Sequence, residues 1–208
     1  MDLTLATAML LMLSPLLLAA ALAVRLASGK PVIFRQSRVG RNGREFQLLK
    51  FRTMAVQHSG TGPGITSPGD PRITGIGKWL RRSKLDELPQ LVNVLRGEMT
   101  LVGPRPDLKE FWRQTSADAS QALQLTPGLT GPASVAFRNE EDLFAHVSPE
   151  QVIKFYVERL LPAKAKLDLE YASEASFLTD CGILLRTLTT SLACGSESAR
   201  NLHEQLSR

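Results

Sequence analysis

The clearest hydrophobic feature of the chain is a block without charged residues over 3–24. As a helix, these roughly 22 residues at about 1.5 Å each match the thickness of a bilayer core, ~30 Å. A secretory signal peptide is the alternative, but it would carry cations before the apolar run. Here Asp2 precedes the run, and Arg25 and Lys30 follow it. We therefore expect a membrane helix whose following domain lies on the cytoplasmic side by the positive-inside rule.

Ser14 and Pro15 interrupt the middle of this apolar run. Proline removes a backbone donor and clashes with the preceding turn, whereas serine can satisfy a carbonyl that is thereby set free. The pair predicts a bend. A bent helix of this length permits two topologies, a spanning helix or a re-entrant helix that enters and leaves through one leaflet. The pattern alone does not choose between them.

A β-hairpin is predicted next. Two apolar-rich runs at 32–34 and 46–49 flank Asn42-Gly43, and Asn-Gly between such runs is a hairpin signal. Because side chains alternate along a strand, Lys50 and Arg52 are expected on one face, where both can reach a single phosphate ligand. A solvated or lipid-facing strand edge is the alternative.

The rest of the chain alternates helical patterns with turn-rich segments. Loops are predicted where Gly, Pro, Ser and Thr gather, at 59–75 and at 127–132. Helical spacing predicts helices at 76–80, 85–95, 107–122, 149–169 and 177–192. Pro89 is tolerated only in a first turn, and Pro162 should kink or split its helix.

Composition adds one domain and a basic field. The 208 residues suffice for a single domain with an attachment. Lys and Arg number 25 against 20 Asp and Glu, and most of the excess lies between residues 25 and 84. Such a field suits anionic lipids, phosphates or nucleic acid, but the scarcity of interleaved aromatic residues speaks against nucleic acid. Cys181 and Cys194 form no metal-ligand spacing with histidine, which favours a reducing compartment.

Adjacent carboxylates at Asp86 and Glu87 carry the candidate chemistry. They precede Pro89 at an expected helix start, where free N–H groups and the helix dipole would keep a carboxylate ionised. An ionised Asp can attack phosphorus or hold a divalent cation against a diphosphate. A simple preference of acids for helix starts is the alternative. Nearby cations, including Arg81 and an Arg105 that a Gly-Pro bend can turn back, favour a phosphoryl-transfer site.

Taken together, these motifs resemble those of the monotopic phosphoglycosyl transferases, a bacterial sugar transferase family. The resemblance covers nearly the whole chain and follows one order. Its motifs are Ser14-Pro15, 31–36, 38–40, Lys-Phe-Arg-Thr-Met at 50–54, Leu-Asp-Glu-Leu-Pro-Gln-Leu at 85–91, Gly-Pro-Arg-Pro at 103–106, Pro-Gly-Leu-Thr-Gly at 127–131, and Asp168 with Tyr171.

The resemblance implies an α+β fold, mostly helical with a small β-hairpin, in a monotopic membrane protein. Residues 1–28 would form the re-entrant anchor, with its bend at Ser14 and Pro15. Residues 29–194 would form the catalytic domain on the cytoplasmic face of the bacterial inner membrane, and 195–208 a polar tail. The resemblance is to the minimal catalytic form of the family, in which we do not expect the large extra membrane domain of some relatives.

The resemblance also implies a magnesium-dependent enzyme that transfers a sugar phosphate from a UDP-sugar to polyprenyl (undecaprenyl) phosphate. Asp86 would attack the phosphate next to the sugar and release UMP, and the lipid phosphate would then take the sugar phosphate from Asp86. Glu87 would act as a base or as a magnesium partner beside Asp86. Phosphate or nucleotide binding would fall to Arg105, Lys50, Arg52, Arg81 and Asp168. A homodimer is among the assemblies left open.

Two departures and two rival functions qualify this interpretation. The chain lacks basic residues before the apolar run, and residues 132–139 differ from the usual family pattern, so sugar recognition is expected to differ. A noncatalytic membrane-tethered binder of anionic lipid or nucleic acid would release no nucleotide. An ordinary glycosyltransferase would release UDP instead of UMP.

Overall fold

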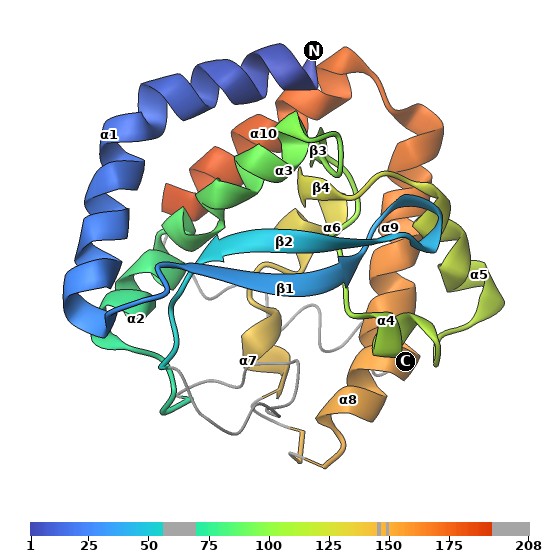
Figure 1. Cartoon of the computed structure of the whole chain (residues 1–208). Helices are drawn as coiled ribbons and strands as arrows, with labels where there is room; N and C mark the ends of the chain where they lie inside the picture. The colour runs from blue at the N-terminus through green and yellow to red at the C-terminus, as the bar shows by residue number, and fades with distance from the viewer. Residues whose placement is uncertain (56–69, 145–146, 149, 193–208) are drawn as a thin grey trace.

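The computed structural model describes residues 1–55, 70–144, 147–148 and 150–192. Within these ranges the chain is mostly helical and carries two small two-stranded sheets (Figure 1). The predicted mixed, mainly helical class is confirmed. Most of the predicted loop at 59–75, Cys194 and the tail at 195–208 lie outside the described residues.

The apolar run forms one helix, α1 (Asp2–Ser28). By length and composition it could cross a membrane, with a mean hydropathy of 2.2 in its most apolar window and only 11% of that window buried. Pro15 offers no N–H to the carbonyl of Leu11, and Ser14 Oγ donates to that oxygen at 2.8 Å. Figure 1 shows α1 changing direction along its length, as the Ser-Pro pair predicts. This exposed apolar helix fits a membrane-associated protein.

One side of α1 is fastened to the rest of the molecule. Ala6 lies in a buried cluster with Leu91, whereas Ala20 and Val24 pack with Leu80 near the other end of the helix. Small and branched side chains therefore face the domain. The opposite side exposes large apolar residues, namely Leu3, Leu5, Leu11, Met12, Leu16, Leu18, Leu22 and Leu26.

The predicted hairpin is confirmed as β1 (Ile33–Val39) and β2 (Glu45–Phe51), paired antiparallel. Its turn contains the short helix η1 (Arg41–Gly43), in which Asn42 adopts φ 57° and Gly43 φ 76°. These left-handed conformations explain the Asn-Gly pair. Asn93 is fully buried beside β2, where its amide donates to the Gln47 carbonyl at 2.8 Å and accepts from the Leu49 nitrogen at 3.1 Å.

The helical segments after the hairpin are more divided than predicted. Helix α2 (Gly75–Arg82) is capped by Thr74, whose Oγ1 accepts from the Gly77 nitrogen at 3.0 Å. The single helix predicted at 85–95 consists of a 3-10 helix, η2 (Leu85–Gln90), followed by α3 (Leu91–Leu95). Pro89 therefore lies within η2 and not in the first turn of an α-helix.

A second sheet replaces the loop predicted at 127–132. Strand β3 (Thr100–Val102) pairs parallel with β4 (Gly128–Thr130). Three residues are too few to show alternation in the sequence. The close approach also needs glycine, because a Cβ on Gly128 would lie 2.1 Å from the Gly103 nitrogen.

The prediction of one continuous helix at 107–122 is also wrong. The structure has α4 (Lys109–Trp112), α5 (Ala117–Ser120) and the 3-10 helix η3 (Gln121–Gln124). Ser116 Oγ accepts from the Ala119 nitrogen at 3.3 Å, and such local side-chain bonds compete with a continuous helix.

The remaining helices form the far side of the domain. They are α6 (Pro132–Ala136), α7 (Glu140–Phe144), α8 (Val152–Phe155), the π-helical turn η4 (Tyr156–Leu160), α9 (Leu161–Glu174) and α10 (Phe177–Leu192). Pro162 lies in the first turn of α9 directly after the π turn, so the predicted irregularity is confirmed. A core cluster that includes Phe111, Phe144 and Leu160 joins this side to the segment after β3.

Candidate active site

The candidate carboxylates lie on η2, which packs against β2. Lys84, the residue before η2, adopts a left-handed conformation with φ 57°. A lysine held in this region of the backbone map is strained, and such residues gather at functional sites. The turn at Lys84 directs the chain so that Asp86 is buried and Glu87 faces β2.

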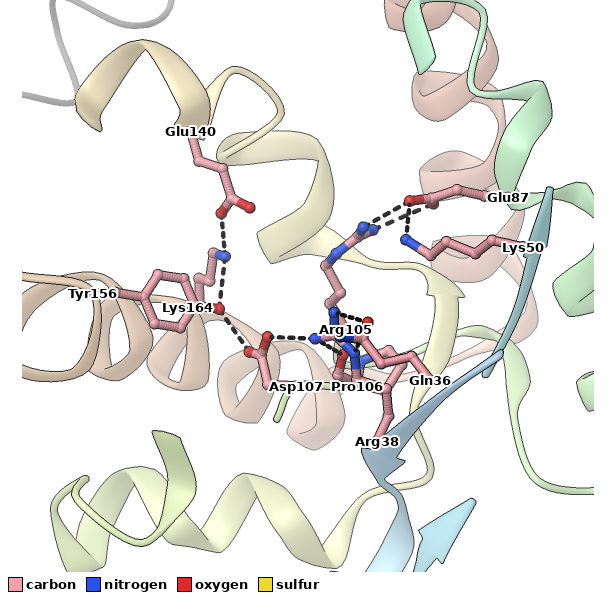
Figure 2. A network of polar contacts seen from close by, with 10 residues as sticks. All are labelled: Gln36, Arg38, Lys50, Glu87, Arg105, Pro106, Asp107, Glu140, Tyr156 and Lys164. Atoms are coloured by element: carbon pink, nitrogen blue, oxygen red, sulfur yellow. Dashed lines mark hydrogen bonds and ion pairs between the residues drawn. The ribbon is translucent and has the colours of Figure 1, made fainter. Parts of the chain in front are cut away.

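Glu87 is the centre of an ion cluster with Lys50 and Arg105 (Figure 2). Lys50 Nζ lies 3.0 Å from Glu87 Oε1, and the Arg105 guanidinium donates to both carboxylate oxygens, at 2.6 and 3.3 Å. Burial alone would raise the pKa of Glu87, but Arg105 and Lys50 outweigh it and hold the pKa well below its usual range. The predicted return of Arg105 towards η2 is therefore confirmed.

Asp86 has the opposite environment. The residue is only 7% exposed, and its buried Oδ1 has no hydrogen-bond partner among the described residues. Burial, followed by the neighbouring Glu87 charge, raises the pKa of Asp86 to about 6. With this pKa, Asp86 remains mainly ionised at pH 7, as expected for a carboxylate at a helix start, although burial makes its charged form less favourable than that of an exposed aspartate.

Cations nevertheless surround Asp86. The charges of Lys50, Lys84 and Arg81 each act against the rise of its pKa. Arg81 is also anchored by its Nε, which donates to Thr53 Oγ1 at 3.1 Å. An acidic oxygen without a partner therefore lies in a field of positive charge, an environment that suits a bound diphosphate.

Arg52 lies elsewhere. Its guanidinium donates to the carbonyls of Lys30 at 2.8 Å and Gly29 at 3.0 Å, and also to that of Ser28. These carbonyls close the C-terminal end of α1, where a cation is favoured by the helix dipole. Lys50 and Arg52 thus serve different partners, and the predicted phosphate contact of Arg52 stays a prediction.

Asp168 lies on α9 and is 4% exposed. Its Oδ1 accepts a long hydrogen bond of 3.4 Å from the Ala133 nitrogen at the start of α6. Burial raises the pKa of Asp168 to about 7. Within the described part of the chain, no hydrogen bond or ion pair joins Asp168 to the Glu87 cluster, so its predicted nucleotide role also stays a prediction.

Sequence reasoning missed a second polar network that begins two residues after Arg105. Asp107 accepts from Tyr156 Oη at 2.7 Å and lies 3.5 Å from the Arg38 guanidinium. Lys164 Nζ reaches Tyr156 Oη at 3.4 Å and pairs with Glu140, as Figure 2 shows. The members come from distant segments, and two of them had a signal in the sequence. Arg38 begins the motif at 38–40, and Asp107 directly follows Gly-Pro-Arg-Pro.

The resemblance implies a magnesium ion, and the arrangement of the carboxylates shows which of them could bind it. The described residues contain no group of three or more acidic, His or Cys side chains that could hold a metal ion. Magnesium, however, is often bound by one or two carboxylates together with substrate phosphates. The unpartnered Oδ1 of Asp86 fits such a site, whereas both oxygens of Glu87 already bind cations.

Comparison with known proteins gives a consistent result. A relative from Escherichia coli, a UDP-glucose:undecaprenyl-phosphate glucose-1-phosphate transferase, is 39% identical over 191 residues, which cover 90% of this chain and 38% of the relative. A protein of the same name from Caulobacter vibrioides is 36% identical over 92% of this chain and 68% of its own length. An uncharacterized sugar transferase from Bacillus subtilis is 36% identical over 90% of this chain and 83% of its own length.

These relatives align along most of this chain, although the chain spans little more than a third of the Escherichia coli protein. A family model described as bacterial sugar transferase matches residues 1–194. The chain belongs to the bacterial sugar transferase family.

Proposed function

We propose that this protein transfers a sugar 1-phosphate from a UDP-sugar to polyprenyl phosphate, giving polyprenyl-diphosphate-sugar and UMP. The observation that carries the proposal is Asp86, a buried carboxylate with an unpartnered oxygen beside an ion cluster that can receive a diphosphate. The names of relatives that act on UDP-glucose and undecaprenyl phosphate support the same donor and acceptor classes.

The reaction proceeds in two balanced steps. A carboxylate oxygen of Asp86 bonds to the phosphorus next to the sugar, and the bond from that phosphorus to the UMP oxygen breaks. UMP leaves with its electron pair, and the sugar phosphate stays on Asp86. An oxygen of polyprenyl phosphate then attacks the same phosphorus and displaces the Asp86 carboxylate. The free enzyme is regenerated without an oxidant or reductant.

The remaining residues of the cluster bind and orient phosphate. Arg105 offers a planar guanidinium to phosphate oxygens, Lys50 and Arg81 add positive charge, and Glu87 holds Arg105 and Lys50 in place. Of the two adjacent acids predicted to bind Mg²⁺, Asp86 has the free oxygen that would hold the ion, and Glu87 lies beside it. When bound, this ion neutralises charge on the diphosphate.

The anchor places this chemistry at the membrane. Helix α1 is re-entrant in this proposal, so the domain lies on the cytoplasmic face of the inner membrane, where nucleotide sugars are supplied. The bend of α1 and the cations that follow the apolar run support this arrangement. Confinement to the membrane surface reduces the search for a lipid phosphate to two dimensions, and the basic residues attract both anionic substrates.

The decisive test measures the nucleotide that is released. We expect detergent-solubilised protein with UDP-glucose, polyprenyl phosphate and magnesium to release UMP in proportion to the lipid-linked product. Release of UDP alone would instead identify a transferase that moves only the sugar. Failure to release any nucleotide across a panel of UDP-sugars would favour the noncatalytic binder.

A further inference from the structure

A third acid lies close to the Asp86–Glu87 pair but comes from a different part of the chain. Glu140 opens α7, more than fifty residues after Glu87. Figure 2 shows the carboxylates of Glu140 and Glu87 on opposite sides of the Arg105 side chain. The two acids also share cations, because Arg105 and Lys84 act on both. Glu140 therefore borders the same charged space as the proposed reaction centre.

The pairing of Glu140 leaves one of its oxygens available. Lys164 Nζ binds Oε2, and no described residue donates a hydrogen bond to Oε1. The Glu140 side chain remains 28% exposed, whereas the Lys164 side chain is only 6% exposed. A purely structural partner for a buried lysine would be expected to turn both oxygens inward. Figure 2 shows the second oxygen of Glu140 turned away from Lys164, to the side on which Arg105 lies.

The environment keeps this oxygen a strong acceptor. Burial alone would raise the pKa of Glu140, but the charges of Lys164 and Arg105 lower it below the usual value. Lys164 is held in turn by Tyr156, whose hydroxyl is fixed by Asp107. An ionised carboxylate that is rigidly placed accepts charge-assisted hydrogen bonds from hydroxyl groups. Phosphate oxygens, in contrast, would be repelled.

We propose that Glu140 is a specificity-determining residue that accepts hydrogen bonds from hydroxyl groups of the hexose in the donor. The proposal rests on the proposed function, because the diphosphate bound between Arg105 and Asp86 brings the attached sugar next to the cluster. The ribose of the nucleotide carries the same chemistry, and the two sources are separated by the experiment below.

The test compares Glu140→Gln with the matched variant Glu158→Gln, an exposed carboxylate on η4 that pairs with Lys154. We expect Glu140→Gln to reduce kcat/KM for UDP-glucose by about tenfold or more, the effect of losing one hydrogen bond to a charged group. Affinity for UDP should stay unchanged. Deoxyfluoro analogues of UDP-glucose identify the hydroxyl group that Glu140 contacts. The analogue that lacks this hydroxyl should have a lower kcat/KM than UDP-glucose with the wild type, but the same kcat/KM as UDP-glucose with Glu140→Gln.

Several outcomes overturn the proposal. Unchanged kcat/KM and unchanged discrimination among the analogues would leave Glu140 with a structural role only. An equal loss of affinity for UDP and UDP-glucose would point to the ribose or to a damaged fold. If the wild type releases no UMP, the proposed function is wrong. The role of Glu140 is then tested separately by titration calorimetry, which measures the affinity for UDP-glucose and for UDP. A preference of the wild type for UDP-glucose over UDP that Glu140→Gln abolishes supports it, and a preference that persists rejects it.

Discussion

Two buried polar clusters lie on either side of the segment that contains Arg105, and they differ in how completely their groups are paired. In the network around Tyr156, the hydroxyl, Asp107 and Lys164 all have hydrogen-bond partners, and none of their side-chain atoms is left buried without a hydrogen bond. In the cluster around Glu87, the neighbouring Asp86 has a buried oxygen without a partner. The Tyr156 network therefore resembles a structural network, whereas the Glu87 cluster contains a buried charge on Asp86 that destabilises the fold.

This difference teaches where reactivity can reside. A buried carboxylate without a hydrogen-bond donor raises the free energy of the folded state, so a neutral side chain at the same position would make the fold more stable. The cost falls when a ligand brings its own positive charge or an electrophilic centre to the carboxylate. The following variants test whether Asp86 is reactive and destabilising, and whether the Tyr156 network is structural.

The largest effect is expected for Asp86→Asn in the transfer reaction. The amide cannot form the bond to phosphorus, so UMP release should fall by at least about 1,000-fold. Labelled sugar phosphate should no longer remain on the protein after incubation with donor alone. The exposed carboxylate variant Glu158→Gln is the control and should retain activity. Normal labelling of Asp86→Asn would move the nucleophile to another residue.

The same substitution should stabilise the fold, with a dependence on pH. The pKa of Asp86 is about 6 in the folded protein and 3.8 as an ordinary carboxyl, so folding disfavours the charged form. Below pH 3.8 the group is neutral in both states and adds no penalty, whereas the penalty grows between pH 3.8 and 6 and is complete above it. Asp86→Asn should therefore gain about 3 kcal/mol of stability at pH 7.

Thermal unfolding at two pH values measures this gain. Asp86→Asn should have a higher Tm than the wild type at pH 7, and the difference should shrink towards zero near pH 4. An equal or lower Tm at pH 7 would show that Asp86 is already compensated in the free protein, and the contrast between the two clusters would disappear.

The smallest effect on activity is expected for Tyr156→Phe. The ring stays in the core, but Asp107 loses its hydroxyl donor, which should cost about 1–3 kcal/mol of stability. UMP release by the folded fraction should change by less than about threefold, because the Glu87 cluster stays intact. Tyr171→Phe, at the other tyrosine of the chain, is the matched control, since its hydroxyl pairs with Asp180 in a more exposed position. A large loss of turnover without loss of stability would place Tyr156 in the reaction.

Local sequence patterns determined much of the architecture. A long apolar run with Ser14-Pro15 is sufficient for a bent, exposed helix, because both the length and the lost backbone donor are properties of adjacent residues. The hairpin followed in the same way from Asn42-Gly43 between two apolar runs. The parallel pair β3 and β4 was missed because each strand depends on a distant partner. The breaks that divide 107–122 into short helices were missed as well, although a local bond to Ser116 favours one of them.

The candidate site shows the same division. Asp86, Glu87 and Arg105 could be selected from local motifs that favoured a phosphoryl-transfer centre, and the family resemblance added Lys50. Tertiary structure decided which acid is paired and which is left bare, and it directed Arg52 to the end of α1. It also brought Glu140 beside Arg105. Burial and pairing depend on groups that are far apart along the chain. The folded structure therefore shifts the pKa values of two adjacent carboxylates in opposite directions, which the sequence alone could not show.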